Sequence, residues 1–511
     1  MKKTNLATIV IVDFGSQYSQ LIVRRIRDSG VYAELWSYQS TKKPNTNIIG
    51  IILSGGPEST QQHQSPKIPK WVWDLQVPVL GICYGMQAMV KAAGGKIDNR
   101  GSGEFGQTSI NLTGSFFAKL KQPKTTVWMS HQDHVATCPP DYQVTATSEN
   151  QMIAAIQHQY QPWFGIQFHP EVSHSVDGIE IIKQFIFQQC KAAINWSTDN
   201  LLQQSLESIQ NQVKGNDRVL LALSGGVDSS VLCTLLHQAI GERLVAVFVD
   251  HGMLRHQEAE NIQSTFQRMM GDQFVLIDAK KTFLAHLEGV TDPEVKRKHI
   301  GKLFIDTFLD FTKNRPVQWL AQGTIYPDVI ESAGADHAKT IKSHHNVGGL
   351  PKNLTLPLLE PFRNLFKDEV RRLGRQLKLD PKIIDRHPFP GPGLAVRIMG
   401  EVTEDRLKTL KKADHIFLTI LRQANLYQQT SQAFTVYLPV QTVGVVGDCR
   451  RVGEVIAIRS VNTDDFMTAT VSKIPYEILS QIATAILNQC DTIARVVFDI
   501  SQKPPATIEW E

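Results

Sequence analysis

The sequence lacks several features that would place it in other classes of protein. It has only six cysteines in 511 residues, and no two of them form a C-x-x-C pair, so neither a zinc site nor a disulfide framework is predicted. Its charges nearly cancel, with 53 Lys and Arg against 49 Asp and Glu, which gives no sign of a nucleic-acid or membrane surface. No apolar run approaches the ~18 residues that a membrane helix needs. We therefore expect a cytoplasmic enzyme acting on small molecules, with no nucleic-acid or membrane partner.

Short apolar runs alternate with helical stretches through most of the chain. The runs TIVIVDFG, IIGIILSGG and VPVLGIC, separated by helical segments such as 17–28, are typical of a parallel sheet covered on both faces. The pattern restarts at RVLLALSGG, after a polar helical connector at 201–215. The fold class predicted is α/β, with two consecutive doubly wound parallel-sheet domains at 1–195 and 196–386. A smaller α+β domain at 387–511 follows the Pro- and Gly-rich junction RHPFPGPGLAVR.

One strand-to-helix turn carries a candidate nucleophile. The segment GICYG, with Cys83 at its centre, follows an apolar strand and opens a helix, which is the setting of a nucleophile elbow. The positive end of the helix favours a thiolate, and the glycines permit a sharp turn and close approach of a substrate. On this pattern alone, a structural cysteine buried beside a tight turn remains an alternative.

A candidate base and its partner follow a second apolar strand, in the segment FHPEV. Residues i and i+2 of an extended segment point the same way, so Glu171 can orient His169 and stabilise its positive charge. The backbone N–H groups of Gly56, in the turn SGGPES, and of Tyr84 are candidate oxyanion donors. Together these groups predict a cysteine-dependent acyl-transfer site.

These motifs resemble the class I glutamine amidotransferase domain. The resemblance rests on SGGPES, GICYGMQ and QFHPEV, which occur in the family's order. It implies that the first domain hydrolyses the side-chain amide of glutamine and releases ammonia. It also implies that Cys83 is the nucleophile, His169 the base and Glu171 the partner of that base.

A second candidate site opens the next α/β domain. Between the apolar run VLLAL and a helical stretch lies a loop whose N–H groups and hydroxyls can surround a phosphate at a helix N-terminus. Its residues are Ser224, Gly225, Gly226, Val227, Asp228, Ser229 and Ser230. The loop has no Walker A lysine, which argues against γ-phosphoryl transfer. Asp250 ends the next strand, where it either meets a ribose or metal-bound phosphate or caps a turn.

The loop S-G-G-x-D-S resembles the pyrophosphatase loop of ATP-dependent adenylating ligases. The resemblance implies that ATP is split to AMP and pyrophosphate with Mg²⁺ as cofactor, and that Asp228 lies near the metal. The segment AQGTIYPDVIES is similar to the nucleotide pocket of the same family, which makes Asp328 a second candidate near the metal.

A basic segment with a glycine pair, KTIKSHHNVGGLP, follows the nucleotide-pocket segment. Cations on a glycine-hinged loop suit a lid over ATP and a phosphorylated substrate, whereas a solvated basic loop is the simpler alternative. The candidate lid residues are Lys339, Lys342, His344 and His345.

The resemblance extends over the whole chain. The segments TDPEVKRKHIG, RHPFPGPGLAVR, SQAFTVYLPV and KPPATIEWE are similar to those of the glutamine-hydrolysing GMP synthase family. The resemblance implies adenylation of the xanthine O2 of XMP, replacement of AMP by ammonia to give GMP, and a homodimer formed by the C-terminal domain. It also implies XMP contacts by Arg297, Lys503, Ile508 and Glu509. Whether Arg297 serves its own subunit or the partner is left open.

Three other functions compete with this interpretation. An NAD synthase-like ligase would share the phosphate loop but would lack Cys83 together with FHPE. A CTP synthase-like enzyme would share the amidotransferase site but would need a lysine-bearing phosphate loop. A non-catalytic nucleotide sensor would keep the folds and lose the chemistry, whereas Cys83, His169, Glu171 and the phosphate loop are all present.

Overall fold

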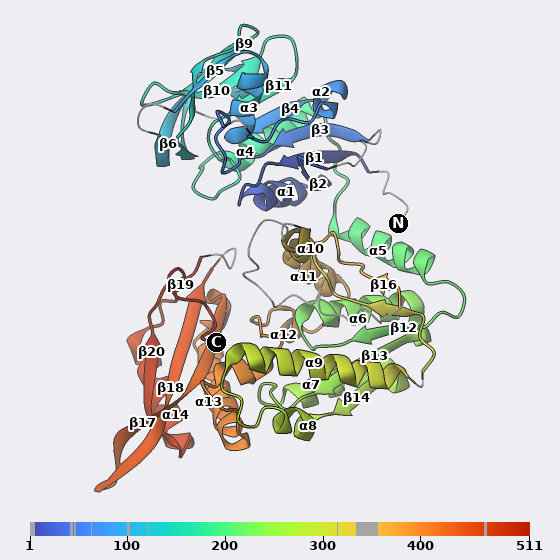
Figure 1. Ribbon diagram of the computed structural model, residues 1–511, viewed down its shortest axis with the longest axis vertical. Coiled ribbons are helices and arrows are strands. Elements are labelled where there is room, and N and C mark those ends of the chain that lie inside the picture. Colours follow the sequence, from blue (N-terminus) through green and yellow to red (C-terminus); the bar gives the residue numbers. More distant parts are fainter. Residues whose placement is uncertain are drawn as a thin grey trace. The chain divides into compact units, whose positions relative to one another are not determined.

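The computed structural model describes residues 6–40, 44, 47–62, 64–99, 103–120, 122–313, 315–333, 356–463 and 468–511. The chain divides into two compact units, Met1–Leu201 and Leu202–Glu511 (Figure 1). Each unit contains parallel strands with helices packed on them, and the second unit adds a C-terminal α+β region. The predicted α/β class is confirmed.

The first unit is built on a nine-stranded sheet in the order β2-β1-β3-β4-β11-β10-β9-β6-β7. Its parallel strands are β2 (Ala33–Ser37), β1 (Thr8–Asp13), β3 (Ile48–Leu53), β4 (Val79–Ile82) and β11 (Trp163–Ile166). Strands β1, β3 and β4 are almost wholly buried, because helices cover both faces of a parallel sheet. The continuous apolar runs in the sequence correctly predicted this half of the sheet.

Antiparallel strands extend the sheet beyond β11. They are β10 (Ile153–His158), β9 (Tyr142–Ser148), β6 (Glu104–Leu112) and β7 (Lys124–His131). Along β6 and β7 buried and less buried residues alternate, which is typical of an antiparallel sheet with one solvated face. Because the prediction relied on continuous apolar runs, it missed this half of the sheet. Two short strands, β5 (Lys96–Asp98) and β8 (His134–Thr137), pair separately.

Helices pack on both faces of the parallel strands. Gly50 of β3 approaches Phe185, which follows α4, whereas Leu53 of the same strand meets Gly85 of α3. Residues three apart in a strand point to opposite faces, so α3 and α4 cover different sides of the sheet. The helices of this unit are α1 (Ser19–Asp28), α2 (Trp71–Asp74), α3 (Tyr84–Ala92) and α4 (Gly178–Lys183), with short turns at η1 (Ser115–Phe117) and η2 (Gln184–Gln189).

The second unit contains a fully parallel sheet in the order β14-β13-β12-β15-β16. The strands are β12 (Val219–Ala222), β13 (Leu244–Asp250), β14 (Phe274–Asp278), β15 (Trp319–Ala321) and β16 (Leu358–Leu359). Its helices are α6 (Val227–Ile240), α7 (Glu258–Met270), α8 (Lys280–Ala285), α9 (Pro293–Thr312), α10 (Tyr326–Ala333), α11 (Lys367–Gln376) and α12 (Pro381–Ile384), with short turns at η3 (Gly241–Arg243) and η4 (Gly271–Gln273). The connector α5 (Thr198–Gln212) spans the boundary between the units.

A long β-hairpin dominates the C-terminal region of the second unit (Figure 1). Strand β17 (Gln432–Val446) pairs with β18 (Cys449–Asn462), and β20 (Ile493–Asp499) runs parallel to β18 on its other side. The helix α13 (Glu404–Gln423) packs against β17, and α14 (Tyr476–Gln489) packs against β20. The remaining elements are β19 (Thr470–Val471), η5 (Gly393–Arg397) and η6 (Tyr427–Gln429).

One hydrophobic core joins the parallel-sheet part of this unit to its C-terminal part. Met253 and Phe283 from the first part share a buried cluster with Leu394, Leu410 and Ile456 from the second. The Pro- and Gly-rich junction therefore lies inside a packed body, and the three-domain division with a boundary at 386/387 stays a prediction. Of the helices that the structure describes, none combines the length and apolarity needed to cross a membrane.

Candidate active sites

Cys83 occupies a strained turn between β4 and α3. Its backbone has φ 51° and ψ −108°, a conformation that a non-glycine residue adopts only where the surrounding structure enforces it. The turn is tightly packed, because a Cβ on Gly85 would lie 2.3 Å from the carbonyl oxygen of Leu53. The N–H of Cys83 donates to the carbonyl of Ile166 at 2.8 Å, which ties the turn to β11. The thiol is thus held at the N-terminus of α3.

His169 and Glu171 lie just beyond β11 and are almost completely buried. Nδ1 of His169 is 2.8 Å from Oε1 of Glu171. The backbone of His169 is fixed by a bond from its N–H to Trp128 at 3.0 Å and by one from the hydroxyl of Ser175 at 2.6 Å. Burial lowers the pKa of His169, but the charge of Glu171 and hydrogen bonds with Cys83 and Glu171 outweigh it and raise the pKa well above its ordinary value. The structure thus brings the three predicted side chains together.

The two candidate oxyanion donors lie beside these side chains. A Cβ on Gly56 would lie 3.4 Å from the ring of Tyr84, and a Cβ on Gly55 would lie 3.1 Å from Cε1 of His169. Tyr84 is the first residue of α3, so its backbone N–H has no acceptor within its own helix. Its phenol donates to the carbonyl of Pro66 at 2.6 Å, which fixes the orientation of the side chain. That Gly56 and Tyr84 donate to an oxyanion stays a prediction.

A loop that the sequence analysis did not single out also borders the thiol. The carbonyl oxygen of Ser130, near the end of β7, lies 3.8 Å from Sγ of Cys83. The same loop carries Asp133, whose carbonyl accepts from Nε2 of Gln87 at 2.8 Å and whose carboxylate accepts from the hydroxyl of Ser59 at 2.5 Å. The polar run SHQD at a strand end was the signal that could have predicted it.

The predicted phosphate loop lies between β12 and α6. The N–H and the hydroxyl of Ser224 bond with the hydroxyl of Ser229 at 3.2 and 2.9 Å, which closes the loop on itself. Gly225 has φ +75°, and a Cβ there would lie 2.2 Å from Cδ1 of Ile262, so only glycine fits. Gly226 is the N-cap of α6, and the N–H groups of the helix N-terminus form an anion-binding cradle.

Two cationic side chains that the sequence analysis missed touch this loop. Nζ of Lys367, the first residue of α11, lies 3.0 Å from Oδ2 of Asp228. Nη1 of Arg386 donates to the carbonyl of Gly225 at 2.5 Å, and its Nη2 pairs with Glu258. Both residues follow the phosphate loop by more than 130 positions, so no local spacing indicates the contacts.

The two other acidic candidates differ in their surroundings. Asp250 ends β13 and is 4% exposed; it accepts from the N–H of Gly252 at 3.0 Å and lies 3.1 Å from Nζ of Lys280. Asp328 lies in the first turn of α10 and accepts from the N–H of Ile325 at 3.0 Å. The segment leading to α10 passes the phosphate loop, since a Cβ on Gly323 would lie 3.6 Å from Cβ of Asp228.

The four candidate lid residues, Lys339, Lys342, His344 and His345, lie outside the described residues.

The residues expected to bind XMP gather at the C-terminal segment. Lys503 pairs with Ala469 through two backbone hydrogen bonds of 2.9 Å. Ile508 is 8% exposed and its side chain packs in an apolar cluster, which leaves its backbone as the part that can meet a ligand. Nη2 of Arg297, on α9, donates to the carbonyl of Glu511 at 2.6 Å, so the structure brings Arg297 to this segment within one chain.

Comparisons with known proteins assign the segments that carry both candidate sites to one enzyme family. Family models match residues 10–189 (glutamine amidotransferase class-I), 198–288 (PP-loop domain) and 419–510 (GMP synthase C terminal domain). The chain is 49% identical to GMP synthases (glutamine-hydrolyzing) of Actinobacillus succinogenes, over 516 residues, and of Stenotrophomonas maltophilia, over 514 residues. Each comparison covers 98% of both chains. The chain belongs to the glutamine-hydrolysing GMP synthase family.

The three family models map onto two compact units. The amidotransferase model lies within Met1–Leu201, whereas the PP-loop and C-terminal models both lie within Leu202–Glu511. The stretch between the latter two models supplies residues that reach both candidate substrate regions of this unit. These residues are Arg297, Lys367, Arg386 and Arg397.

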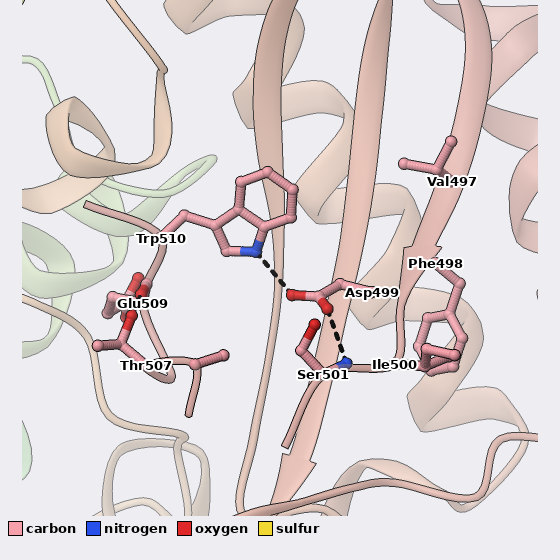
Figure 2. Close-up of a pocket in the computed structure, with 9 residues that line it drawn as sticks. Val497, Phe498, Asp499, Ile500, Ser501, Thr507, Glu509 and Trp510 are labelled. Carbon is pink, nitrogen blue, oxygen red and sulfur yellow. Dashed lines mark hydrogen bonds between the residues drawn. The ribbon is translucent and has the colours of Figure 1, made fainter. Parts of the chain in front are cut away.

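A pocket of about 520 Å³ borders the C-terminal segment of this GMP synthase family member (Figure 2). Its lining includes Glu509 and Thr507, together with apolar side chains at the end of β20. Nε1 of Trp510 donates to Asp499 at 2.9 Å, and the N–H of Ser501 donates to the other oxygen of Asp499 at 2.9 Å. The C-terminal segment is therefore ordered beside a cavity of the size that small ligands occupy.

Proposed function

We propose that this chain synthesises GMP from XMP, with glutamine as the nitrogen donor and ATP as the activating nucleotide. The observation that carries the proposal is the presence of a Cys–His–Glu site and a lysine-free phosphate loop in one chain. Membership of the glutamine-hydrolysing GMP synthase family supports the same reaction. The first site releases ammonia and the second activates its acceptor.

In the glutaminase half, His169 takes the proton of the Cys83 thiol as Sγ attacks the amide carbon of glutamine. The C–N bond breaks as His169 gives a proton to the departing ammonia, and a thioester remains. His169 then takes a proton from water, which hydrolyses the thioester to glutamate and regenerates the thiol. Glu171 orients His169 through the 2.8 Å contact, and the N–H groups of Gly56 and Tyr84 stabilise the oxyanion.

In the synthetase half, Ser224–Ser230 hold the phosphates of ATP while O2 of XMP attacks the α-phosphorus. The bond to pyrophosphate breaks, and an XMP-adenylate forms. Ammonia then adds at C2, and AMP leaves to give GMP. Lys367 and the N-terminus of α6 are assigned to the departing negative charge, and Asp250, which ends β13, is assigned to the ribose.

One carboxylate oxygen at the phosphate loop is available to Mg²⁺. Oδ2 of Asp228 pairs with Lys367, whereas Oδ1 is buried and has no hydrogen-bond partner within the described ranges. Mg²⁺ keeps water and phosphate oxygens as ligands and needs only one or two carboxylates. Asp228, with Asp328 in the first turn of α10, would hold the ion, and the bound ion would neutralise charge on the phosphates.

The proposal divides the work among three segments. Residues 1–195 hydrolyse glutamine, 196–386 adenylate XMP, and 387–511 contact XMP and form a homodimer. The phosphate of XMP is assigned to Arg297 and Lys503, and its base to the backbone of Ile508 and the carboxylate of Glu509. The candidate lid residues of the basic segment would close over ATP and XMP.

Exposed apolar side chains on the long hairpin support a homodimer. The most exposed are Val440, Val445 and Val452, at 59%, 76% and 58%. A solvated hairpin arm of this kind suits pairing with a second copy of the chain. A cytoplasmic location fits the nucleotide substrates and the six free cysteines.

The proposal is tested by mass-resolved product analysis with ATP, Mg²⁺, glutamine and XMP. GMP, AMP, pyrophosphate and glutamate are expected in equal amounts. ADP and phosphate would contradict adenylation, and glutamate without GMP would contradict XMP as the acceptor. Sedimentation of the chain, compared with Val445→Asp, tests the homodimer.

A further inference from the structure

Two fully buried cations anchor the C-terminal segment from outside it. Nζ of Lys296, on α9, donates to Oε2 of Glu511 at 2.6 Å. Nη1 of Arg459, on β18, donates to the carbonyl of Ser501 at 2.5 Å, and its Nη2 donates to that of Thr507 at 3.0 Å. Both cationic side chains are 0% exposed. Nε of Arg459 also donates to the carbonyl of Ile508 at 3.4 Å. Nζ of Lys296 also donates to the carbonyls of Ala395 and Ile398, on either side of Arg397. These contacts explain how the segment is held.

Arg397, the last residue of η5, is a third fully buried cation, and it binds the carboxylate of Glu509. Nε of Arg397 lies 3.0 Å from Oε2 and Nη2 lies 2.8 Å from Oε1, which is a side-on, two-bond contact. Nε2 of Gln432 donates to the same Oε1 at 2.7 Å. The guanidinium lies over the ring of Phe434, 4.0 Å from its centroid, and Phe389 lies 5.2 Å from it. The carboxylate is therefore held in one orientation.

Burial differs sharply between the two partners. The side chain of Arg397 is 0% exposed and that of Glu509 is 20% exposed. Glu509 also lines the pocket in Figure 2, whereas Arg397 does not. Nη1 of Arg397 is buried and lacks a hydrogen-bond partner among the residues that the structure describes. The arginine thus contacts the carboxylate of Glu509 from the buried side, whereas Glu509 itself lines the pocket.

We propose that Arg397 is a positioning residue that aims Glu509 at the base of the purine nucleotide. This inference rests on the proposed function, in which Glu509 contacts the base. A carboxylate accepts hydrogen bonds from the ring N–H and amino groups that xanthine and guanine present, and only a fixed carboxylate selects their direction. A lysine in place of Arg397 keeps the charge but removes the planar two-bond contact.

The test separates binding of the base from binding of the phosphate. Calorimetry of the full chain measures the Kd of GMP and the Kd of ribose 5-phosphate, which lacks a base. Arg397→Lys is expected to raise the Kd of GMP at least tenfold and the Kd of ribose 5-phosphate less than twofold. Glu509→Gln is expected to change the two Kd values by the same factors. Glu511→Gln is the control, because it removes the carboxylate that Lys296 holds on the same segment and leaves both Arg397 and Glu509 in place, and the ratio of its two Kd values should match that of the unmodified chain.

Each contrary result has a distinct meaning. The preference for GMP is the Kd of ribose 5-phosphate divided by the Kd of GMP. If Glu509→Gln lowers this ratio and Arg397→Lys leaves it within twofold, the inference is wrong and the proposed site stands. If Arg397→Lys weakens both ligands equally, its role is structural and the inference is again wrong. If the unmodified chain does not prefer GMP, or Glu509→Gln leaves the preference unchanged, the assignment of Glu509 in the proposed function fails. Should Arg397→Lys not fold, Gln432→Leu removes a second bond to the same carboxylate and should lower the preference about threefold.

Discussion

Nδ1 of His169 lies 2.8 Å from Oε1 of Glu171, and both side chains are almost completely buried. The contact joins residues only two positions apart, at the end of a strand whose neighbour leads into Cys83. A buried imidazole beside a carboxylate gains a proton more readily than one in water, in spite of its desolvation. This arrangement lets one histidine receive and return the protons of thioester formation and hydrolysis.

Glu171→Gln should lower the pKa of His169, because it removes the charge that most strongly opposes desolvation. The limb of the glutaminase pH profile that titrates with His169 should then move to lower pH, and kcat should fall by roughly 10²-fold. A shift of that limb to higher pH would contradict the role of Glu171.

The same pair should contribute to stability. The folded chain holds a proton on His169 above pH 6.5, where the unfolded chain has lost it. The stabilisation is therefore fully present below pH 6.5 and is lost as pH rises through the raised pKa. Urea titrations of the full chain at several pH values should show this fall, and Glu171→Gln should flatten it.

Cys83→Ala should abolish GMP synthesis from glutamine and spare synthesis from added ammonium. The physical reason is that Cys83 acts only on the amide, while the phosphate loop lies in the other compact unit. Initial rates of GMP formation with each nitrogen source provide the measurement. Equal loss with both sources would contradict this division of labour.

Lys367→Met should reduce XMP-dependent release of pyrophosphate by roughly 10²-fold with either nitrogen source, because it removes a cation beside Asp228 at the phosphate loop. Lys313→Met is a matched control. It removes the exposed ion pair between Lys313 and Asp310, whose N–O distance of 2.7 Å is close to that of the Lys367–Asp228 pair. This change should leave the rate unchanged. Equal rates for both variants would refute a role for Lys367.

The features that could be predicted from the sequence are those whose residues lie close together in the chain. The HxE pair, the elbow around Cys83 and the phosphate loop each occupy fewer than eight positions, and the structure places each at a strand end. The parallel strands could be predicted equally well, because a strand that is buried on both faces needs a continuous apolar run.

Contacts between distant positions could not be predicted in this way. Arg386 reaches Gly225 across 161 positions, and Arg397 reaches Glu509 across 112. Each depends on how α7, η5 and the C-terminal segment pack, and an arginine in a Pro- and Gly-rich stretch gives no sign of its partner. For Ile508 the structure adds what the sequence could not show, namely that its side chain packs in an apolar cluster, so that a contact with the ligand would involve its backbone.

Buried histidines should make the second unit sensitive to acid. Burial lowers the pKa of His387, which stacks on Tyr427 with ring centroids 3.8 Å apart, to about 4. Between pH 6.5 and about 4 the unfolded chain therefore binds a proton that the folded chain excludes, so stability rises with pH and is lost as pH falls. The 2.5-unit difference corresponds to about 3 kcal/mol at pH 4. Hydrogen exchange of α13 in the full chain should lose protection over this range. His387→Asn should lower protection at pH 7 through lost packing but weaken its pH dependence by about one proton, and an unchanged slope would show that His387 does not titrate in this window.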